Sequence, residues 1–520
     1  MSDWRWTLDL LERKAGVYPD REVVWYEPAG RWYTYGELNS RARRLANALT
    51  AGLGLKKGDR VAVLARNIIE YFDFFFATQK TGLVLVPLNL RLSPDELTFM
   101  IKLTGPKVLA YEADFAALAA QLAMSPGVEA AIRIGRGTDT VDAAGAIDYQ
   151  ELLAKARDAV PDASPIDLAD PHLLLFTGGT TGLPKAAILS HRAFYFNMVS
   201  EAVCWGLGPN STAPNMLPFF HTGGWNLLTL PLIFAGGRLL LDRGFDPQEI
   251  LDWIPKHRIT MLFGAATMYH MMEQLPSFAK TDLSSLECVM SGAAACPRPV
   301  MEPFWDRGTV FVQGMGITEG GPNNLFMPWK RLSWETMKAK WRSVGIPFMY
   351  CQAKVVDEEG HQTKPDELGE LLLSGPVVFS GYWQNEKATA DTLIDGWVHT
   401  GDIAAVDADG FFYIMDRKKD MFISGGENVF PVEVEAVLST HPKVSEVAVI
   451  GVPDDKWGEV GKAFIVPRPG HNPTPEELAQ FLQGKIARYK IPKHYTLTDS
   501  LPKSGVGKIL KRVLRESKSA

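Results

Sequence analysis

Residues 173–185 read Leu-Leu-Leu-Phe-Thr-Gly-Gly-Thr-Thr-Gly-Leu-Pro-Lys. The apolar run 173–176 predicts a buried strand, and a loop rich in glycine and threonine follows it. Such a loop can turn backbone N–H groups and hydroxyls toward a phosphate, and Lys185 adds a positive charge. It is not a Walker loop, because no Gly-Lys-Ser/Thr sequence follows. A flexible surface turn is the alternative, but the Pro-Lys ending favours a phosphate loop.

Strand-like and helix-like segments alternate on both sides of this loop. Residues 60–64 predict a buried strand, and residues 35–49 predict an amphipathic helix whose polar face carries Arg41, Arg43 and Arg44. The strand signal returns at residues 107–111 and 261–263. This alternation predicts an α/β fold, with a large N-terminal domain of mainly parallel sheets and packed helices.

The pattern breaks at the charged segment Asp416-Arg-Lys-Lys-Asp420, after a strand-like stretch at 410–415. Beyond it, strand and helix signals occur at residues 431–438, 444–452, 462–466 and 476–486. Residues 421–520 are therefore expected to form a small α+β domain, and residues 1–415 the large domain. The charged segment itself predicts either a solvated loop or a hinge.

Composition excludes several classes of protein. The 520-residue chain is too long for one core, and its net charge of −6 argues against a nucleic-acid-binding protein. Four scattered cysteines disfavour a disulfide scaffold or structural zinc site and suit a reducing compartment. The N-terminal stretch lacks the apolar core of a signal peptide, and the longest apolar runs are too short to span a bilayer. We expect a cytoplasmic protein with no integral membrane segment.

A second lysine loop lies near the C-terminus, at Gly505-Val-Gly-Lys508. It resembles the end of a Walker motif, but Pro502 stands where the earlier glycine is needed and Ile509 where Ser or Thr is needed. What remains is one lysine on a small-residue loop, which on its own is usually a solvated turn.

Several separate motifs follow one another along the chain, and their order helps to interpret these two loops. They are Tyr33-Thr-Tyr-Gly-Glu-Leu38, Leu217-Pro-Phe-Phe-His221, Ser291-Gly-Ala-Ala-Ala-Cys-Pro297, Gln313-Gly-Met-Gly-Ile-Thr-Glu319, Ser343-Val-Gly-Ile-Pro347, Trp397-Val-His-Thr-Gly-Asp402, the segment 416–420, residues 424–435 and residues 501–508. Over nearly the whole chain they resemble the adenylate-forming enzymes, which include acyl- and aryl-CoA ligases, amino-acid adenylation domains and beetle luciferases. The resemblance to the AMP-forming acid:CoA ligase branch implies three ligands, ATP, Mg²⁺ and coenzyme A. It also implies a mobile C-terminal domain that rotates between two half-reactions.

The resemblance implies a nucleotide site as well. Its residues would be Thr177, Gly178, Gly179, Thr180, Thr181, Gly182, Lys185, Gly292, Ala293, Ala294, Gly314, Met315, Gly316, Thr318, Asp402 and Arg417. The first seven would hold the triphosphate, while Asp402 and Arg417 would contact the ribose. Glu319 with Thr177 would bind Mg²⁺. Lys508 would bridge the carboxylate and the α-phosphate as charge develops.

The acid and CoA sites follow from the same resemblance. The acid pocket would be formed by His221, Gly223, Gly224, Trp225, Gly292 and Gly314. His221 would separate the acyl and pantetheine channels, although a lone histidine there is also often a satisfied core residue. CoA would meet Ser424, Gly425, Gly426, Glu427, Arg488, Tyr489 and Lys490. Lys419 would be the pivot, which favours a hinge over a loop at 416–420.

Three positions depart from the family pattern. Gly178 replaces a serine that is usual in the phosphate loop, Ala186 replaces a common glycine, and Met315 replaces a tyrosine beside adenine. Methionine still packs on a ring through its polarizable sulfur. These changes leave nucleotide affinity open without removing a group that the chemistry requires.

The segments expected to line the acid pocket, 215–232 and 288–297, contain no residue of fixed charge. Since burying an unpaired charge is costly, an apolar acid is expected. A medium- or long-chain fatty acid fits best, and an aryl or arylalkanoic acid is the alternative.

Three competing functions are weaker. An amino-acid adenylation domain would carry an aspartate where His221 stands, and an oxygenase of the luciferase kind is disfavoured by the ending Ser517-Lys-Ser-Ala. A non-catalytic binding protein would be expected to lose Lys508, Glu319 or Asp402, which are all present. The expected partners are small-molecule substrates, with a homodimer suggested by family analogy alone.

Overall fold

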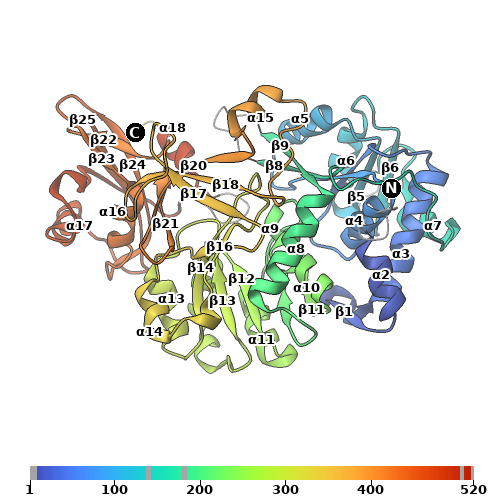
Figure 1. Cartoon of the computed structure of the whole chain (residues 1–520), viewed down its shortest axis with the longest axis horizontal. Coiled ribbons are helices and arrows are strands. Elements are labelled where there is room, and N and C mark those ends of the chain that lie inside the picture. Colours follow the sequence, from blue (N-terminus) through green and yellow to red (C-terminus); the bar gives the residue numbers. More distant parts are fainter. Residues whose placement is uncertain (1–8, 136–141, 178–183, 504–508, 517–520) are drawn as a thin grey trace.

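The computed structural model describes residues 9–135, 142–177, 184–503 and 509–516. Within these ranges the strands form five sheets. The N-terminal elements lie at one end of the elongated molecule and the C-terminal elements at the other (Figure 1). This architecture confirms the predicted fold class.

The seven-stranded sheet has the order β7-β6-β5-β3-β4-β8-β9. Its strands are β3 (Arg60–Leu64), β4 (Val84–Pro87), β5 (Val108–Glu112), β6 (Ala130–Ile134), β7 (Ile147–Asp148), β8 (Pro171–Thr177) and β9 (Lys185–Ser190). All its pairs are parallel except β8 with β9. Its helices are α4 (Glu70–Thr81), α5 (Pro94–Thr104), α6 (Ala116–Ala123) and α7 (Tyr149–Lys155). The strand expected at 173–176 is the centre of β8.

Helix α3 (Tyr35–Asn47) begins at a capping box, in which Thr34 and Glu37 satisfy each other's backbone N–H groups. A π-helical turn, Ala48–Gly52, extends it. Arg41, on the polar face of this helix, does not point into solvent alone: its Nη2 lies 2.6 Å from Oδ2 of the fully buried Asp73. A buried carboxylate needs a cation and donors around it, and this need draws Arg41 into the interface with α4.

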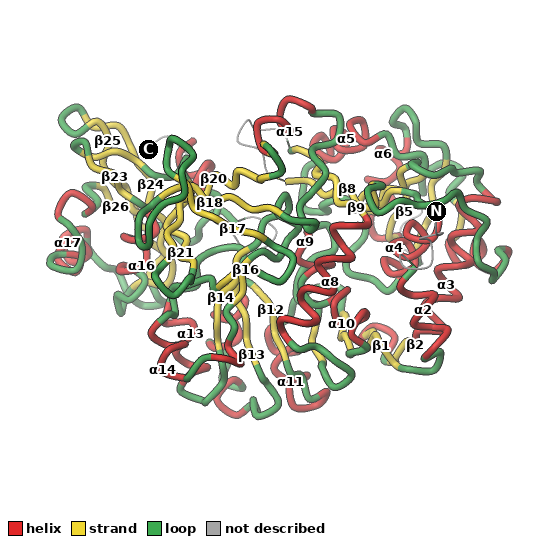
Figure 2. The backbone as a smooth tube through the Cα atoms, in the orientation of Figure 1, coloured by secondary structure: helices red, strands yellow, loops and turns green. Residues whose placement is uncertain are grey.

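Two further sheets lie along the lower side of the molecule in Figure 2. One has the order β10-β11-β1-β2, with β1 (Glu22–Tyr26), β2 (Arg31–Thr34), β10 (Thr212–Pro214) and β11 (Arg238–Leu241). The other has the order β12-β13-β14-β15-β16, with β12 (Met261–Gly264), β13 (Cys288–Ser291), β14 (Phe311–Met315), β15 (Leu325–Phe326) and β16 (Ile346–Pro347). The helices of this region are α8 (His191–Trp205), α9 (Thr222–Asn226), α10 (Thr229–Ala235), α11 (Pro247–His257), α12 (Ala266–Glu273), α13 (Arg298–Trp305) and α14 (Trp334–Ala339). β12, β13 and β14 are parallel, so their carboxyl ends share one edge.

A fourth, antiparallel sheet leads to the C-terminal region. It contains β17 (Gln352–Val356), β18 (Gly369–Ser374), β19 (Leu393–Ile394), β20 (Trp397–Val406) and β21 (Phe412–Arg417). Two further helices are α2 (Leu10–Val17), which precedes β1, and α15 (Glu386–Thr392), which lies between β18 and β19 along the chain. β21 continues through Asp416, whose buried side chain accepts a hydrogen bond from the Val432 N–H at 3.0 Å. Asp416 is therefore not part of a solvated loop, because it caps backbone of the next segment.

The last sheet has its own core. Its strands are β22 (Phe422–Ser424), β23 (Glu427–Val429), β24 (Val444–Asp454), β25 (Gly458–Pro467) and β26 (His494–Leu497), with α16 (Pro431–Leu438), α17 (Pro475–Leu482) and α18 (Lys511–Glu516). The segment expected at 431–438 is a helix with those bounds, whereas the segment expected at 476–486 is a helix that ends at Leu482. The hinge role of 416–420 stays a prediction. In the described part of the chain, no helix is long and apolar enough to cross a membrane.

Candidate active site

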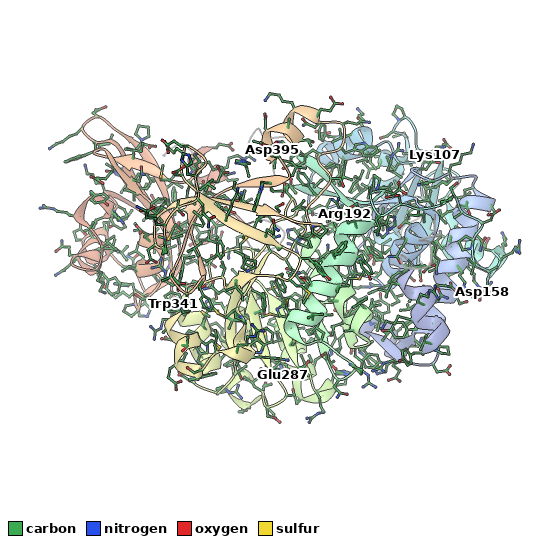
Figure 3. The ribbon with its side chains drawn as sticks, in the orientation of Figure 1. Lys107, Asp158, Arg192, Glu287, Trp341 and Asp395 are labelled. Atoms are coloured by element: carbon green, nitrogen blue, oxygen red, sulfur yellow. The ribbon has the colours of Figure 1, made fainter. Side chains whose placement is uncertain are left out.

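A cavity opens at the carboxyl ends of β12, β13 and β14. Its walls include Gly264 from β12, Gly292 and Ala293 after β13, and residues 314–316 from the end of β14. The cavity has a volume of about 50 Å³ and opens to solvent at its mouth. Glu287, labelled at the lower edge of Figure 3, precedes β13, so the cavity lies toward the centre of the molecule. Ligands bind at this edge in many parallel sheets.

The cavity wall is apolar and rich in rings. Trp205, Phe263, Phe326 and Phe348 line it together with leucine and methionine side chains. Phe326 and Phe348 stack with ring centroids 4.4 Å apart. None of the lining residues that the structure describes carries a fixed charge, in agreement with the expectation from residues 215–232 and 288–297.

Small residues bring backbone close to the cavity. A Cβ on Gly292 would lie 2.7 Å from Cζ of Phe263, and one on Gly316 would lie 1.5 Å from the carbonyl oxygen of Pro322. Ala293 has φ +69°, a left-handed conformation uncommon for a residue with a Cβ. The segments 292–294 and 314–316 thus lie at the ends of adjacent strands. All of their residues except Ala294 are on the cavity wall. Thr318 is buried just beyond them, and Ala294 is exposed.

His221 lies at the wall, at the N-terminus of α9. Its Nδ1 accepts a hydrogen bond from the N–H of Gly223 at 3.2 Å, which caps the helix. A neutral ring that accepts at Nδ1 carries its proton on Nε2. The histidine is thus neither a buried core residue nor a freely rotating one.

Two expected pocket residues lie elsewhere. Trp225 is fully buried, stacks on Phe219 at 4.1 Å and donates from Nε1 to the Phe219 carbonyl at 2.8 Å. Gly224 is not on the wall, and a Cβ there would lie 2.4 Å from the carbonyl oxygen of Pro218. Neither residue is on the wall of this cavity, because α9 turns its Trp225 face into the aromatic core. His221, Gly223, Gly292 and Gly314 do line the cavity.

Strand pairing brings the two ends of the phosphate-like loop together. Thr177 ends β8 and Lys185 begins β9, and the two are partners in the ladder. Gly178, Gly179, Thr180, Thr181 and Gly182 lie outside the described residues. The ends of the loop are therefore fixed side by side, at the edge of the seven-stranded sheet.

Glu319 joins this loop to the region after β14. Its Oε1 accepts hydrogen bonds from Thr177 Oγ1 at 3.0 Å and from the Tyr382 hydroxyl at 2.7 Å. Burial and then the charge of Glu319 raise the pKa of the Tyr382 phenol, which therefore stays a donor. Lys185 Nζ lies 5.0 Å from the Tyr382 ring centroid. The result is a compact group of one carboxylate, two hydroxyls and one ammonium.

Tyr382 was missed from the sequence. It follows Gly381, whose φ of +127° permits the sharp approach of this segment to β9. A glycine before two aromatic residues was the only local signal.

Asp402 and Arg417 are partners on adjacent strands. They face each other in the β20–β21 ladder, with Arg417 Nε 2.6 Å from Asp402 Oδ1. Asp402 is buried and Arg417 is about one third exposed. The pair gives a fixed carboxylate at the junction between the fourth sheet and the C-terminal sheet.

The residues expected for CoA lie on the C-terminal sheet. Ser424, Gly425, Gly426 and Glu427 form the turn from β22 to β23, and both glycines have positive φ. Arg488, Tyr489 and Lys490 form a short 3₁₀ turn. Lys490 Nζ pairs with Glu433 at 2.5 Å. None of these seven is among the residues that line the cavity.

The expected pivot and the C-terminal lysine loop lie beside α18. The carbonyl of Lys419 accepts a hydrogen bond from Arg515 at 3.4 Å, and Arg515 also pairs with Asp420 at 2.7 Å. Lys508 lies outside the described residues. The two ends of its loop meet in an isolated bridge between Lys503 and Ile509.

Comparison with known proteins agrees with this arrangement. The chain matches the AMP-binding enzyme family over residues 11–383 and the AMP-binding enzyme C-terminal domain over residues 433–508. A feruloyl-CoA synthase from Amycolatopsis sp is 39% identical over 503 residues, covering 97% of both chains. A long-chain-fatty-acid–CoA ligase from Mycobacterium tuberculosis is 33% identical over 98% of both chains.

Solved structures extend the likeness to three dimensions. The anthranilate CoA ligase AuaEII, in complex with anthranoyl-AMP, superposes with a TM-score of 0.89 at 27% identity. The match covers 98% of this chain and 96% of that one. Fold, motif order and both family matches therefore agree: the chain belongs to the AMP-binding enzyme family, in its branch of AMP-forming acid:CoA ligases.

Proposed function

We propose that this protein forms the CoA thioester of an aromatic carboxylic acid. One observation carries the proposal: the uncharged cavity is lined by four aromatic residues of the described chain, two of which, Phe326 and Phe348, stack on each other. Flat, rigid rings pack favourably against a flat substrate ring, edge-on or offset. The feruloyl and anthranilate relatives support the same choice. This reverses the order expected from the sequence, where a fatty acid came first.

In the first half-reaction, a carboxylate oxygen attacks the α-phosphorus of ATP, and the bond to pyrophosphate breaks. Two anions must approach each other, so fixed positive charge and N–H donors lower the barrier. The loop 177–185 would hold the triphosphate, and Lys508 would bridge carboxylate and α-phosphate. His221 would bound the pocket beside the reacting carboxyl group.

Glu319 and Thr177 fit a Mg²⁺ site. One carboxylate and one hydroxyl oxygen meet at 3.0 Å, and Mg²⁺ is usually held by one or two carboxylates with phosphate and water completing the shell. When bound there, the ion would neutralise charge on the phosphates. Tyr382 would orient the carboxylate by its 2.7 Å hydrogen bond.

The nucleoside would lie between the strand ends and the β20–β21 pair. Asp402 would accept the ribose hydroxyls while Arg417, 2.6 Å from its Oδ1, holds the carboxylate in place. Gly292, Ala293, Ala294, Gly314, Met315, Gly316 and Thr318 would approach adenine with small side chains and the Met315 sulfur.

In the second half-reaction, the CoA thiol loses its proton and its sulfur attacks the acyl carbon, and the bond to AMP breaks. We propose that the C-terminal sheet turns about Lys419, so that Ser424–Glu427 replaces the Lys508 loop. Gly425 and Gly426 would give the pantetheine arm room, and Arg488, Tyr489 and Lys490 would meet CoA phosphates.

The test is CoA-dependent AMP formation from ATP with a panel of acids, from acetate through long-chain fatty acids to benzoates and phenylalkenoates. We expect the highest kcat/KM for an aromatic acid. Lys508→Ala should lower it by about 10²–10³-fold, on the scale of one lost electrostatic contact in the transition state. No AMP formation with any acid would refute the function, and a variant as active as the wild type would refute the role of Lys508.

A fatty acid is the second candidate, favoured by the uncharged wall and the Mycobacterium tuberculosis relative. A kcat/KM that rises with chain length and exceeds that of every aromatic acid would select it instead.

A further inference from the structure

Helix α8 carries three polar side chains on one buried face. Asn197, Glu201 and Trp205 are spaced by four residues, so they lie above one another along the helix. Their exposed fractions are 1%, 0% and 2%. Figure 3 labels Arg192, at the start of this helix, near the centre of the molecule. We call these three residues the α8 polar face.

This face is rich in unsatisfied groups. Among the described residues, no hydrogen-bond partner is present for Trp205 Nε1, for either carboxyl oxygen of Glu201, or for Asn197 Oδ1. Native proteins pair more than nine in ten of their buried polar groups, with protein or with ordered ligands and water. Several unpaired groups on one helix face therefore indicate a place that receives something polar.

The α8 polar face reaches the acid cavity through Trp205 and is linked to it through Asn197, and Glu201 lies between these two residues along the helix. Trp205 itself lines the cavity, and its ring packs edge-on against Phe348 of the wall, 5.4 Å between centroids. A second link runs through the carbonyl of Asn226. It accepts hydrogen bonds from Asn197 at 2.9 Å and from Asn323, which also lines the cavity, at 3.1 Å.

Glu201 is suited to neutral hydrogen bonding. Burial raises the pKa of its carboxyl well above the usual range. Cys204, on the same helix, also raises the pKa of Glu201, and burial raises the pKa of the Cys204 thiol in turn. A neutral carboxyl has one O–H donor and one carbonyl acceptor. It therefore offers no charge to an ammonium group, but both roles to a hydroxyl.

We propose that the α8 polar face is the far end of the acid site and recognises an oxygen substituent on the substrate ring, a phenolic hydroxyl or an aryl ether. This inference rests on the proposed function. The Trp205 N–H donates to the substituent oxygen, and Glu201 accepts from a hydroxyl or donates to an ether. The acid that fits is an arylalkenoic or arylalkanoic acid oxygenated on the ring.

The experiment compares matched acids: cinnamate, 4-hydroxycinnamate and 4-hydroxy-3-methoxycinnamate. The measured quantity is the ratio of kcat/KM for each oxygenated acid to that for cinnamate. A site built to hydrogen-bond a substrate hydroxyl discriminates strongly against the analogue that lacks it, so the wild-type ratio should be about tenfold or more.

Four variants separate the contributions. Trp205→Phe keeps a ring and removes the N–H, and should lower the ratio by about three- to tenfold. Glu201→Leu should lower it similarly, whereas Glu201→Gln keeps a neutral donor and acceptor and should retain it. The control is Trp305→Phe, in another core, where Nε1 is already bonded to the Phe311 carbonyl at 3.1 Å. It should leave the ratio unchanged.

The outcomes distinguish the two proposals. Absence of activity on every aromatic acid refutes the proposed function. Activity on cinnamate with a ratio near one, or a ratio that Trp205→Phe and Glu201→Leu leave unchanged, overturns the α8 assignment and leaves the function standing. A Glu201→Gln variant as poor as Glu201→Leu overturns the role of a neutral carboxyl.

Discussion

The bond between Tyr382 and Glu319 gives the sharpest test of how the nucleotide site is organised. Tyr382→Phe removes a 2.7 Å hydrogen bond and, among the described residues, leaves Glu319 Oε1 with the 3.0 Å bond from Thr177. A hydrogen bond to a charged group contributes about 1.5–3 kcal/mol. Because Glu319 is only partly buried, water can replace the phenol in part, so the lower end applies. That figure corresponds to about a tenfold loss.

The loss should appear in kcat/KM for Mg²⁺-ATP, measured by pyrophosphate release with saturating acid and without CoA. The Mg²⁺ concentration for half-maximal rate should rise as well, since the carboxylate is less well oriented. The control is Tyr413→Phe, which removes a 3.0 Å bond from Tyr413 on β21 to Asp407 in the turn before it, a similar tyrosine–carboxylate pair. Equal rates and equal Mg²⁺ dependence for the two variants would refute the assignment of Glu319 to the metal and of Tyr382 to its orientation.

Two further predictions concern stability. Gly316→Ala places a Cβ 1.5 Å from the Pro322 carbonyl oxygen, and the backbone must move to relieve this clash. The apparent Tm should therefore fall by several degrees, which corresponds to a loss of about 3 kcal/mol in the free energy of unfolding. The control Gly208→Ala places its Cβ in open space and should leave the Tm unchanged, so equal Tm values for the two variants would contradict the close approach at Gly316. The stacked pair His172 and His191 should make the fold acid-sensitive, because burial lowers the pKa of His191 to about 3 from 6.5. Below pH 6.5 the unfolded chain binds a proton on this histidine that the folded protein does not bind. The free energy of unfolding therefore has its full value above pH 6.5 and falls by about 1.4 kcal/mol per pH unit below it. Thermal melts from pH 7.5 to 5 should show a shallower decline for His191→Phe than for the wild type or the exposed control His361→Phe, and parallel declines would argue against the histidine as the cause.

Local signals predicted the elements well where they were strong. The helix at 431–438 begins with proline in its first turn and has the predicted bounds. The loop at 177–185 was found because a strand, glycines and a lysine are adjacent in the sequence. Family resemblance then placed residues that no local pattern connects, such as Asp402 and Arg417, which only the β20–β21 register brings together.

Long-range contacts account for what the sequence did not predict. Arg41 has the spacing of a solvated face, but a buried aspartate 32 residues away pairs with it. Trp225 follows two glycines beside His221, yet the aromatic core packed under α9 takes its ring. Tyr382 contacts Glu319 across 63 residues, so no window of sequence contains both. In each case the partner, and not the residue itself, decides the role.

The same reasoning explains why the acid could not be identified from pocket composition. The segments 215–232 and 288–297 are uncharged, and taken alone they favour any apolar acid. The α8 polar face comes from a different segment, and in a sequence Asn197 and Glu201 are typical of the solvated side of a helix. Only the fold shows that this side of the helix is buried. Because it is buried, each polar group on it that has no hydrogen-bond partner costs desolvation free energy. Specificity would then depend mainly on the buried polar groups at the far end of the cavity, which have no hydrogen-bond partner among the described residues until a substrate supplies one. For this reason, matched acids that differ by one oxygen test the specificity more sharply than a series of chain lengths does.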